Sequence, residues 1–267
     1  MFLNSLKKIF EPKKTRQAIL FAMHYPSNKA LEEFQKIKES TLGIADCFVS
    51  YDNRDGKVID QAISRESHWI FSEEDMSQLV YYIKKGQSLT PGGNHWPVIR
   101  FAKERAYDYY WNIEYDVKFI GDWKLFFSHF ANAKDDFITS HIRSFRQEPY
   151  WYYWPTLFHP EKKINRLKYL RSFNPIYRIS HRALEYIDKM HEDKWMGHHE
   201  VLIPTLLRKG RFKLRDFGGT GRFVRFGERN LFYIDSSSPA LFDGSMRYRP
   251  EVASFQEYKN KLAHPVK

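Results

Sequence analysis

The chain has 267 residues, and its 43 Lys and Arg against 32 Asp and Glu give a formal net charge of +11. Its 42% hydrophobic and 17% aromatic content excludes a largely disordered chain, and no stretch approaches the ~18 uncharged apolar residues of a membrane-spanning helix. The single cysteine, Cys47, excludes a disulfide scaffold and argues against Cys-ligated zinc.

Residues 1–16 form a basic amphipathic segment. Phe2, Leu6 and Ile9 recur at helical spacing, and Lys7 and Lys8 interrupt the apolar run. The run is too short for a signal peptide, so we expect a cytoplasmic protein. Two alternatives remain for the segment: an interfacial helix in peripheral contact with the inner face of the membrane, or a helix packed on its own domain.

Short apolar runs alternate with amphipathic segments over residues 17–120. Ser72 and Asp75 have the spacing of a capping box. Strands followed by helices predict an α/β fold with a mostly parallel central sheet flanked by helices. Strands are expected at 18–23, 45–51, 68–71 and 107–119, and helices at 28–39, 72–83 and 97–105.

Residues 121–267 follow a less regular pattern. Helices are expected at 122–132, 181–191 and 200–208, strands at 136–145, 177–179, 212–217 and 231–235, and an aromatic loop at 150–158. No break in composition separates this half from residues 17–120. We therefore expect a single domain in which the two halves share one sheet.

The stretch from Gly92 to Val117 (GGNHWPVIRFAKERAYDYYWNIEYDV) carries the strongest chemical signal. Glu114 and Asp116 end an expected strand, where open parallel sheets bind ligands, and share one face if the strand persists. Two carboxylates there could hold Mn²⁺ or Mg²⁺ beside a diphosphate. Gly93 and Asn94 would let the backbone approach a nucleotide. The alternative is a surface acidic pair after a core strand.

This order of Gly-Asn turn, helix, strand and acid-x-acid resembles the GT-A fold glycosyltransferases of bacterial polysaccharide synthesis. The resemblance implies a GT-A-like, Rossmann-like fold, a nucleotide-sugar donor and a divalent metal held by Glu114 and Asp116. The sequence departs from the usual Asp-x-Asp because its first acid is Glu. Some GT-A enzymes work without metal, so Glu114 in place of the usual Asp leaves the metal requirement of this chain open.

A second segment, residues 195–207 (WMGHHEVLIPTLL), fits the same resemblance. Many inverting GT-A enzymes have a catalytic base at the start of a helix after a glycine, and Glu200 matches that position. The resemblance implies that Glu200 deprotonates the acceptor and that His198 and His199 contact it. From the residues alone, Glu200 is equally an acid favoured by the dipole of a helix start.

The resemblance implies further contacts to the nucleotide-sugar donor, and these rest on less specific patterns. His264 and Lys267, near the end of the chain, match a late metal-binding histidine and a basic contact to the diphosphate; a solvated terminus is the alternative. Asp52 follows the second strand, where GT-A enzymes contact base or ribose, or it is a turn residue bonded to its own backbone. His24 ends the first strand and would flank the base or pack in the core.

An aromatic run and a base-rich stretch in residues 121–267 are the candidates for binding the acceptor. Trp151 and Trp154 would stack on sugar rings or pack in the core. The base-rich stretch 162–182 would attract an anionic acceptor, a lipid diphosphate or a membrane surface, or form a solvated face.

The leading hypothesis is a glycosyltransferase that moves a sugar, with inversion, from a UDP-linked donor to a glycan or lipid-linked acceptor. Residues 17–120 would form its nucleotide-sugar-binding half and residues 121–267 its acceptor-binding half. The alternatives are a basic nucleic-acid-binding module, a nucleotide-sugar-binding protein without catalysis and, more weakly, a nucleotidyltransferase. The sequence has no recognisable nucleic-acid-binding motif, so we expect no nucleic-acid partner.

Overall fold

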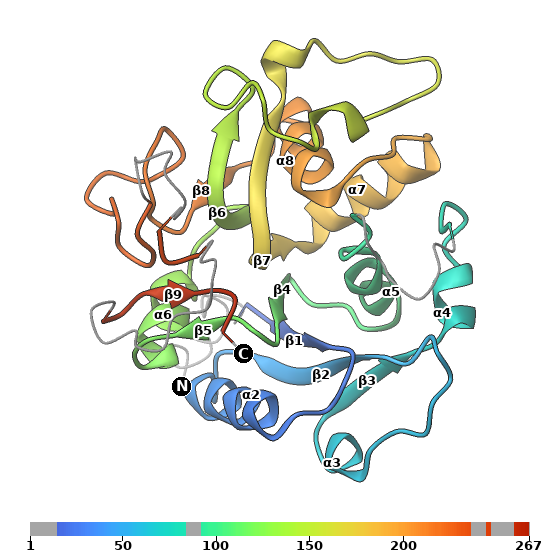
Figure 1. Cartoon of the computed structure of the whole chain (residues 1–267), viewed down its shortest axis with the longest axis vertical. Coiled ribbons are helices and arrows are strands. Elements are labelled where there is room, and N and C mark those ends of the chain that lie inside the picture. Colours follow the sequence, from blue (N-terminus) through green and yellow to red (C-terminus); the bar gives the residue numbers. More distant parts are fainter. Residues whose placement is uncertain (1–14, 84–91, 236–243, 247–258, 267) are drawn as a thin grey trace, which may run out of the picture.

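The computed structural model describes residues 15–83, 92–235, 244–246 and 259–266. A 7-stranded sheet forms its centre, in the order β3-β2-β1-β4-β7-β6-β8 (Figure 1). The strands are β1 (Gln17–Met23), β2 (Asp46–Asp52), β3 (His68–Phe71), β4 (Tyr109–Glu114), β6 (Phe137–Ser144), β7 (Leu170–Ser180) and β8 (Leu214–Asp216).

Only β7 runs against the other strands of this sheet. The strands β1 to β4 pair in parallel, β6 pairs in parallel with β8, and β7 is antiparallel to both β4 and β6. The expected mostly parallel sheet with flanking helices in a single domain is therefore confirmed. Such a sheet collects the ends of β1, β2, β3 and β4 at one edge, where loops bind ligands.

Helices cover both faces of the sheet. One core packs α5 (Trp96–Glu104), α7 (His181–Glu192) and α8 (His199–Lys209) on one face. The other core packs α2 (Asn28–Ser40) and α6 (Trp123–Phe130) on the opposite face. Two short helices, α3 (Gln61–Ser64) and α4 (Glu73–Ser77), lie between strands, and 3₁₀ turns form at Trp154–Thr156 and Arg166–Lys168. None of the helices in the described part has the length and apolarity to cross a bilayer.

A small second sheet ties the chain's end to the middle of the fold. β9 (Leu262–Ala263) pairs with β5 (Lys118–Phe119), and the Val266 amide donates to the Asp116 carbonyl at 2.8 Å. In Figure 1, β9 lies beside β5 near the end of β4. This pairing carries His264 to the acidic end of β4.

Most expected elements form, and the exceptions have local causes. The strand expected at 107–119 divides into β4 and β5, because a turn bonded from the Val117 amide to the Glu114 carbonyl interrupts it. The helix expected at 72–83 starts at its capping box but ends at Ser77. Beyond it the chain forms turns over residues 78–81. There the neighbouring side chains of Tyr81 and Tyr82 bond to different elements, Tyr81 to Asp188 of α7 and Tyr82 to Glu73 of α4.

Two expected strands differ in extent. β7 spans 11 residues, although a strand was expected only at 177–179. Asn174 and Pro175 break its sequence pattern, but the pairing between β6 and β7 is irregular in this region, where a proline is tolerated. Residues 231–235 were expected to form a strand and do not. They are held by separate hydrogen bonds, among them Leu262 amide to Phe232 carbonyl at 2.7 Å.

The amphipathic segment predicted at 1–16 lies, except for its last residues, outside the described residues, and Lys267 lies outside them as well. The predicted roles of both stay predictions, as does the assignment of donor and acceptor functions to residues 17–120 and 121–267.

Candidate active site

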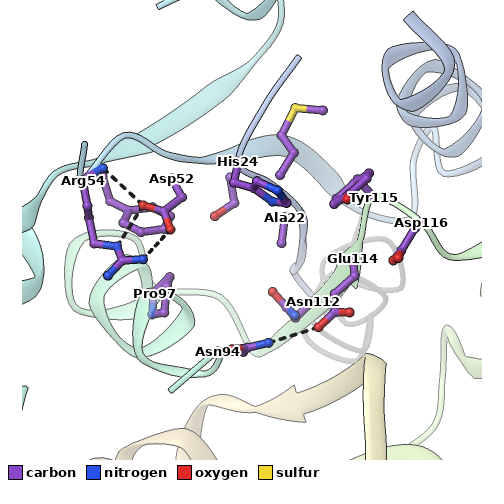
Figure 2. A pocket seen from close by; sticks show the side chains of 13 residues that line it. Ala22, His24, Asp52, Arg54, Asn94, Pro97, Asn112, Glu114, Tyr115 and Asp116 are labelled. Carbon is purple, nitrogen blue, oxygen red and sulfur yellow. Dashed lines mark hydrogen bonds and ion pairs between the residues drawn. The ribbon is translucent and has the colours of Figure 1, made fainter. Parts of the chain in front are cut away.

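A pocket opens at the carboxyl ends of the parallel strands (Figure 2). Its volume is about 520 Å³, which is in the range of small-molecule sites. β1, β2, β3 and β4 all contribute, because parallel strands end at the same edge of the sheet. The lining residues are Ala22, Met23, His24, Ser50, Asp52, Arg54, Phe71, Asn94, Pro97, Asn112, Glu114, Tyr115 and Asp116.

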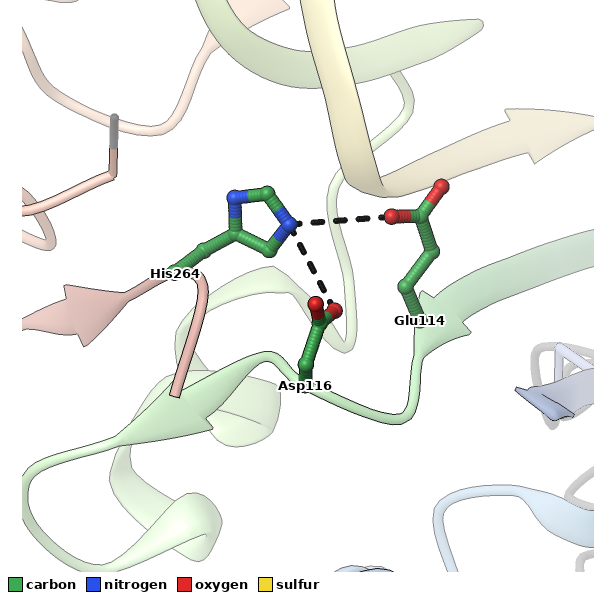
Figure 3. Close-up of side chains that lie close together, drawn as sticks. All are labelled: Glu114, Asp116 and His264. Carbon is green, nitrogen blue, oxygen red and sulfur yellow. Dashed lines mark ion pairs between the residues drawn. The ribbon is translucent and has the colours of Figure 1, made fainter. Parts of the chain in front are cut away.

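Glu114, Asp116 and His264 meet at one side of this pocket (Figure 3). One ligand atom from each lies within 4.8 Å of the others. His264 Nε2 is 3.7 Å from Glu114 Oε2 and 3.4 Å from Asp116 Oδ1. The two carboxylates converge through the turn after β4 rather than by alternation along a continuous strand.

The donor set of this cluster fits a hard divalent cation. Asp116 Oδ1 is buried and accepts no hydrogen bond from the residues that the structure describes, and carboxylate oxygens with an imidazole nitrogen are ordinary ligands of Mn²⁺. His264 Nδ1 lies 3.2 Å from the Met246 carbonyl, which leaves Nε2 for a ligand, as in most metal-bound histidines. Burial alone would lower the pKa of His264, but Asp116 and Glu114 outweigh it and raise the pKa to about 9.

The far side of the pocket is built by an ion pair after β2. Arg54 donates from Nε and Nη2 to the Asp52 carboxylate at 2.9 and 2.7 Å, and from its backbone amide at 3.2 Å. Arg54 also donates to Tyr82 Oη at 3.2 Å. Asp52 thus bonds its own turn, the alternative considered from the sequence, while it still lines the pocket.

An aromatic group separates the two sides. His24, Tyr25 and Tyr115 pack edge to face, with ring centroids 5.0 to 5.3 Å apart. Figure 2 shows His24 between the Asp52 side and the Glu114 side of the pocket, and Tyr115 on the Glu114 side, next to Asp116. Tyr115 stands between the two acids in sequence, and its ring offers an apolar surface to a planar ligand.

The glycine turn before α5 links the pocket to α8. Gly92 has φ +97, and a Cβ there would lie 2.5 Å from His198 Cα. The Gly92 carbonyl accepts from the His199 amide at 3.1 Å, and the Gly93 carbonyl accepts from the Trp96 amide at 2.9 Å. Asn94 Nδ2 donates to Glu114 Oε1 at 3.2 Å. One turn therefore contacts both the acidic cluster and the start of α8.

Glu200 is buried in the first turn of α8, beside β7. Its Oε1 accepts from the Asn174 amide at 3.2 Å. Asn174 is two residues from Ile176, which pairs with Ile113 of β4, so Glu200 adjoins the strand that ends at Glu114. The backbone donor and the helix start both favour the charged carboxylate.

His198 caps α8 and is held by stacking. Its Nδ1 accepts from the Glu200 amide at 3.3 Å, and its ring stacks on Tyr153 at 3.8 Å between centroids. Burial lowers the pKa of His198 to about 4, so the ring is neutral at pH 7. The 3.8 Å separation between His198 Nδ1 and Glu200 Oε2 is accordingly not an ion pair at that pH.

His199 points into a buried histidine cluster that the sequence did not reveal. His95 and His191 approach at 2.7 Å between Nε2 atoms, and the rings of His95 and His199 are parallel at 6.2 Å. Burial, together with the neighbouring histidines, keeps the pKa of His95 and His199 well below the usual range. The predicted acceptor role of His199 stays a prediction.

The tryptophans of the aromatic loop lie on its inner side. Trp154 is 2% exposed and donates from Nε1 to the Glu148 carbonyl at 2.7 Å. Trp151 is half-buried and stacks under Arg171, 5.3 Å from its guanidinium carbon. Both anchor the loop, and their predicted role in acceptor binding stays a prediction.

Sequence reasoning missed several pocket residues, among them Arg54, Asn112 and Tyr115. Asn112 had a usable signal, because a polar residue inside an otherwise apolar strand is unusual. Arg54 lies in a turn-rich segment and carried none.

No family model matches the sequence, and no curated protein is significantly similar to it. A CMP:2-keto-3-deoxy-manno-octonic acid synthetase complexed with CTP is similar over 79% of this chain and 94% of that chain, with 14% identity and a TM-score of 0.40. Glucosyl-3-phosphoglycerate synthase from Mycobacterium tuberculosis, in complex with Mn²⁺, uridine-diphosphate and phosphoglyceric acid, is similar over 76% and 68%, with 13% identity and a TM-score of 0.42.

A 4-diphosphocytidyl-2C-methyl-D-erythritol synthase from Anaerococcus prevotii is similar over 80% of this chain and 92% of that chain, with 9% identity and a TM-score of 0.45. With identities of 9 to 14%, these similarities concern the fold alone. The strand order and the pocket at the carboxyl ends define a Rossmann-like, GT-A-like domain.

Proposed function

We propose that this chain is a glycosyltransferase that moves a sugar from a nucleotide-sugar, UDP-linked, to a hydroxyl of a glycan or lipid-linked acceptor. One observation carries the proposal: Glu114, Asp116 and His264 lie close enough together to hold a cation, at a pocket of about 520 Å³. Glu200 contacts β7, the strand that pairs with the strand ending at Glu114. An inverting glycosyltransferase needs both groups around one anomeric carbon, because the acceptor attacks that carbon on the side opposite to the departing diphosphate. Contact with the inner face of the membrane through residues 1–16 belongs to the same proposal.

The donor would lie across the pocket. His24 and Tyr115 offer ring surfaces for the nucleoside, and the far wall holds the carboxylate of Asp52. The diphosphate would lie beside Glu114, Asp116 and His264. A Mn²⁺ or Mg²⁺ held by these residues would neutralise the leaving diphosphate. Asn94 orients Glu114 through its amide, and Lys267 would add a positive charge.

Glu200 would act as the general base. It takes the proton of the acceptor hydroxyl while the hydroxyl oxygen bonds to the anomeric carbon. The bond between that carbon and the diphosphate oxygen breaks, and its electron pair leaves with the nucleoside diphosphate. The attack from the opposite side inverts the anomeric centre. The backbone amide of Asn174 and the start of α8 hold the Glu200 carboxylate in place for this step.

Thermal unfolding with UDP, with and without Mn²⁺, tests the donor site. We expect UDP with Mn²⁺ to raise the melting temperature, because a ligand that binds only the folded state stabilises it. Asp116→Asn should abolish the part of the shift that depends on Mn²⁺. Asp55→Asn is a matched control, since Asp55 lies in the turn after β2 and forms an ion pair with Lys57, two residues away. The absence of any shift with any nucleoside diphosphate would overturn the proposal.

Product analysis separates the remaining candidates. A glycosyltransferase releases a nucleoside diphosphate, a nucleotidyltransferase releases pyrophosphate, and a binding protein releases neither. The connection from β1 to α2, His24 to Ser27, contains no glycine, whereas phosphate-cradling loops at such a turn are usually glycine-rich. That observation favours sugar transfer over nucleotidyl transfer. A steep salt dependence of oligonucleotide binding would favour the nucleic-acid alternative.

A further inference from the structure

A rigid crest of the fold exposes aromatic and cationic side chains together. The crest comprises residues 145–168, which connect β6 to β7 and form the end of the molecule drawn at the top of Figure 1. Its aromatic run alternates in direction: Trp151 and Trp154 face the core, whereas Tyr150 is 97% and Tyr152 83% exposed. Phe158 and Leu167 are also exposed, at 58% and 48%.

Contacts within the fold hold these side chains outward. Trp154 bonds the Glu148 carbonyl, Phe158 exchanges backbone hydrogen bonds with Met196 at 2.8 and 2.9 Å, and Asn165 caps the turn at Arg166–Lys168. The exposed tyrosines are therefore displayed by a fixed scaffold. Water-exposed aromatic rings gathered on one segment indicate a binding surface.

The charge of the crest is one-sided. Arg146, Lys163, Arg166 and Lys168 are exposed and form no ion pair with any residue that the structure describes. Lys162 pairs with Asp193, and Glu148 pairs with Arg171, so both are neutralised locally. Only Glu161 remains as an exposed, unpaired acid within the crest. The surface therefore complements a dense layer of negative charge.

We propose that the crest docks on an anionic lipid bilayer. Tyrosines partition to the interface between lipid headgroups and acyl chains, and each Lys or Arg near an anionic surface adds electrostatic attraction. A soluble polyanion would use the cations but would gain little from Tyr150, Tyr152 and Leu167, which are spread over two turns of the crest. The combination of rings and unpaired cations therefore favours the lipid surface.

Together with the proposed function, on which this step rests, the position of the crest indicates the class of acceptor. Tyr153 of the crest stacks on His198, the residue that caps the helix of Glu200. The contacts from Glu200 to the crest pass through His198 and Tyr153, so a docked crest would turn the proposed base toward the membrane surface. The acceptor class that fits is then a hydroxyl carried on a membrane lipid, presented from the bilayer to Glu200.

Vesicle co-sedimentation of the full-length protein tests the docking. We expect binding to vesicles of phosphatidylcholine with phosphatidylglycerol, weakened by salt, and much weaker binding to phosphatidylcholine alone. Tyr150→Ser with Tyr152→Ser should weaken binding on the order of 10-fold. Lys163→Gln, Arg166→Gln and Lys168→Gln together should weaken it about 100-fold.

Matched controls come from the opposite end of the molecule. Leu42→Ser removes an apolar side chain that is 78% exposed, and Lys29→Gln, Arg65→Gln and Lys124→Gln remove exposed cations near α2, α3 and α6. These variants should bind vesicles like the wild type. All crest variants should keep the thermal shift with UDP and Mn²⁺, so failure of docking and failure of the donor site are distinguishable.

Three results would overturn the proposal. The crest variants could bind anionic vesicles as well as the wild type does. The full-length variant Lys7→Gln with Lys8→Gln could lose all vesicle binding while the crest variants lose none, which would assign the binding to the N-terminal segment alone. A single-stranded oligonucleotide could bind as tightly as the vesicles and be insensitive to the tyrosine substitutions, which would identify the crest as a site for a soluble polyanion.

Discussion

At the scale of single residues, the acidic cluster depends on groups far apart in the sequence. Asp116 has a buried oxygen without a donor, and His264 has one nitrogen fixed by a backbone carbonyl and the other facing the carboxylates. Like charges so close repel each other unless a cation lies between or beside them. The imidazole of His264 supplies that positive charge here, because the two carboxylates raise its pKa to about 9.

His264→Gln removes the nitrogen that faces Glu114 and Asp116. We expect the affinity for Mn²⁺ to fall by more than about 10-fold, because fewer ligands remain and the carboxylates lose their oriented neighbour. Isothermal titration with Mn²⁺ measures this change. His181→Gln, at a half-exposed position on α7, should leave the affinity unchanged. An unchanged affinity in His264→Gln would remove that residue from the proposed ligand set.

Glu200→Gln keeps the shape of the proposed base but removes its ability to take a proton. Turnover should fall on the order of 100- to 10,000-fold, while the thermal shift with UDP and Mn²⁺ stays intact. Release of nucleoside diphosphate in the presence of acceptor is the assay. Glu185→Gln, an exposed acid on α7, serves as the control. Near-normal turnover in a folded Glu200→Gln protein would exclude Glu200 as the base.

At the scale of elements, the turn before α5 joins the donor and acceptor sides of the site. Gly92 contacts the start of α8 through its carbonyl and its missing side chain, and Asn94 bonds Glu114. A displacement of α8 therefore reaches the acidic cluster through the short turn of residues 92–94.

Gly92→Ala tests that connection. The new Cβ would collide with the backbone of His198, and φ +97 is unfavourable for alanine. We expect a loss of about 2–4 kcal/mol in the free energy of unfolding and a more than 10-fold loss of turnover, since small displacements of reacting groups are costly. Urea unfolding and the product assay measure both.

Gly56→Ala provides the matched control for Gly92→Ala. Gly56 also has a positive φ, +68, but nothing lies within 4 Å of an added Cβ. This variant should lose only about 1 kcal/mol of stability and keep its turnover. Equal effects of the two substitutions would show that backbone strain alone, rather than contact with α8, explains the loss.

Local patterns predicted the elements whose sequence and environment agree. β1 has a continuous apolar run, β2 is a short, largely apolar segment closed by a turn, and α7 has one apolar face, so each was found close to its true bounds. The length of β7 could not be predicted, because Pro175 interrupts its pattern and only pairing with two neighbours keeps it extended. The pairing of β9 with β5 was equally invisible, since a strand of two residues carries no period.

The residues of the candidate site also fall into those that local sequence patterns predict and those that depend on the tertiary fold. Glu114 and Asp116 follow a recognisable strand, so sequence reasoning found them, whereas Arg54 and Tyr115 enter the pocket through turn geometry. Sequence reasoning also named His264 through the resemblance, although its contact with the acids depends on the tail pairing beside β5.

At the scale of the whole molecule, a buried histidine cluster joins the three helices on one face of the sheet. His95 begins α5, His191 lies near the end of α7, and His198 and His199 begin α8. Their rings lie in contact or stacked upon one another, and Tyr81 stacks on His191 at 4.5 Å. Packing of α5, α7 and α8 against the sheet therefore requires these rings to be neutral.

The cluster should make the stability of the fold fall in mild acid. Burial lowers the pKa of His191 and of His198 to about 4, whereas a histidine in the unfolded chain has a pKa of about 6.5. Below pH 6.5 the unfolded chain therefore binds more protons than the native protein, and the free energy of unfolding decreases as the pH falls. From pH 7 to pH 5, each such histidine should cost about 2 kcal/mol.

Urea unfolding at pH 7 and pH 5 measures this loss, and His191→Gln identifies its source. The substitution removes one titrating group, so the difference in stability between the two pH values should shrink by about 2 kcal/mol, even if the variant is less stable at both. His181→Gln, on the same helix but half-exposed, should leave the difference as in the wild type. If His191→Gln also leaves it unchanged, the acid sensitivity does not arise from the histidines that pack α5, α7 and α8 together. In that case the buried carboxylate of Asp216, whose pKa burial raises, could not replace them, because a raised carboxyl pKa stabilises the fold as the pH falls.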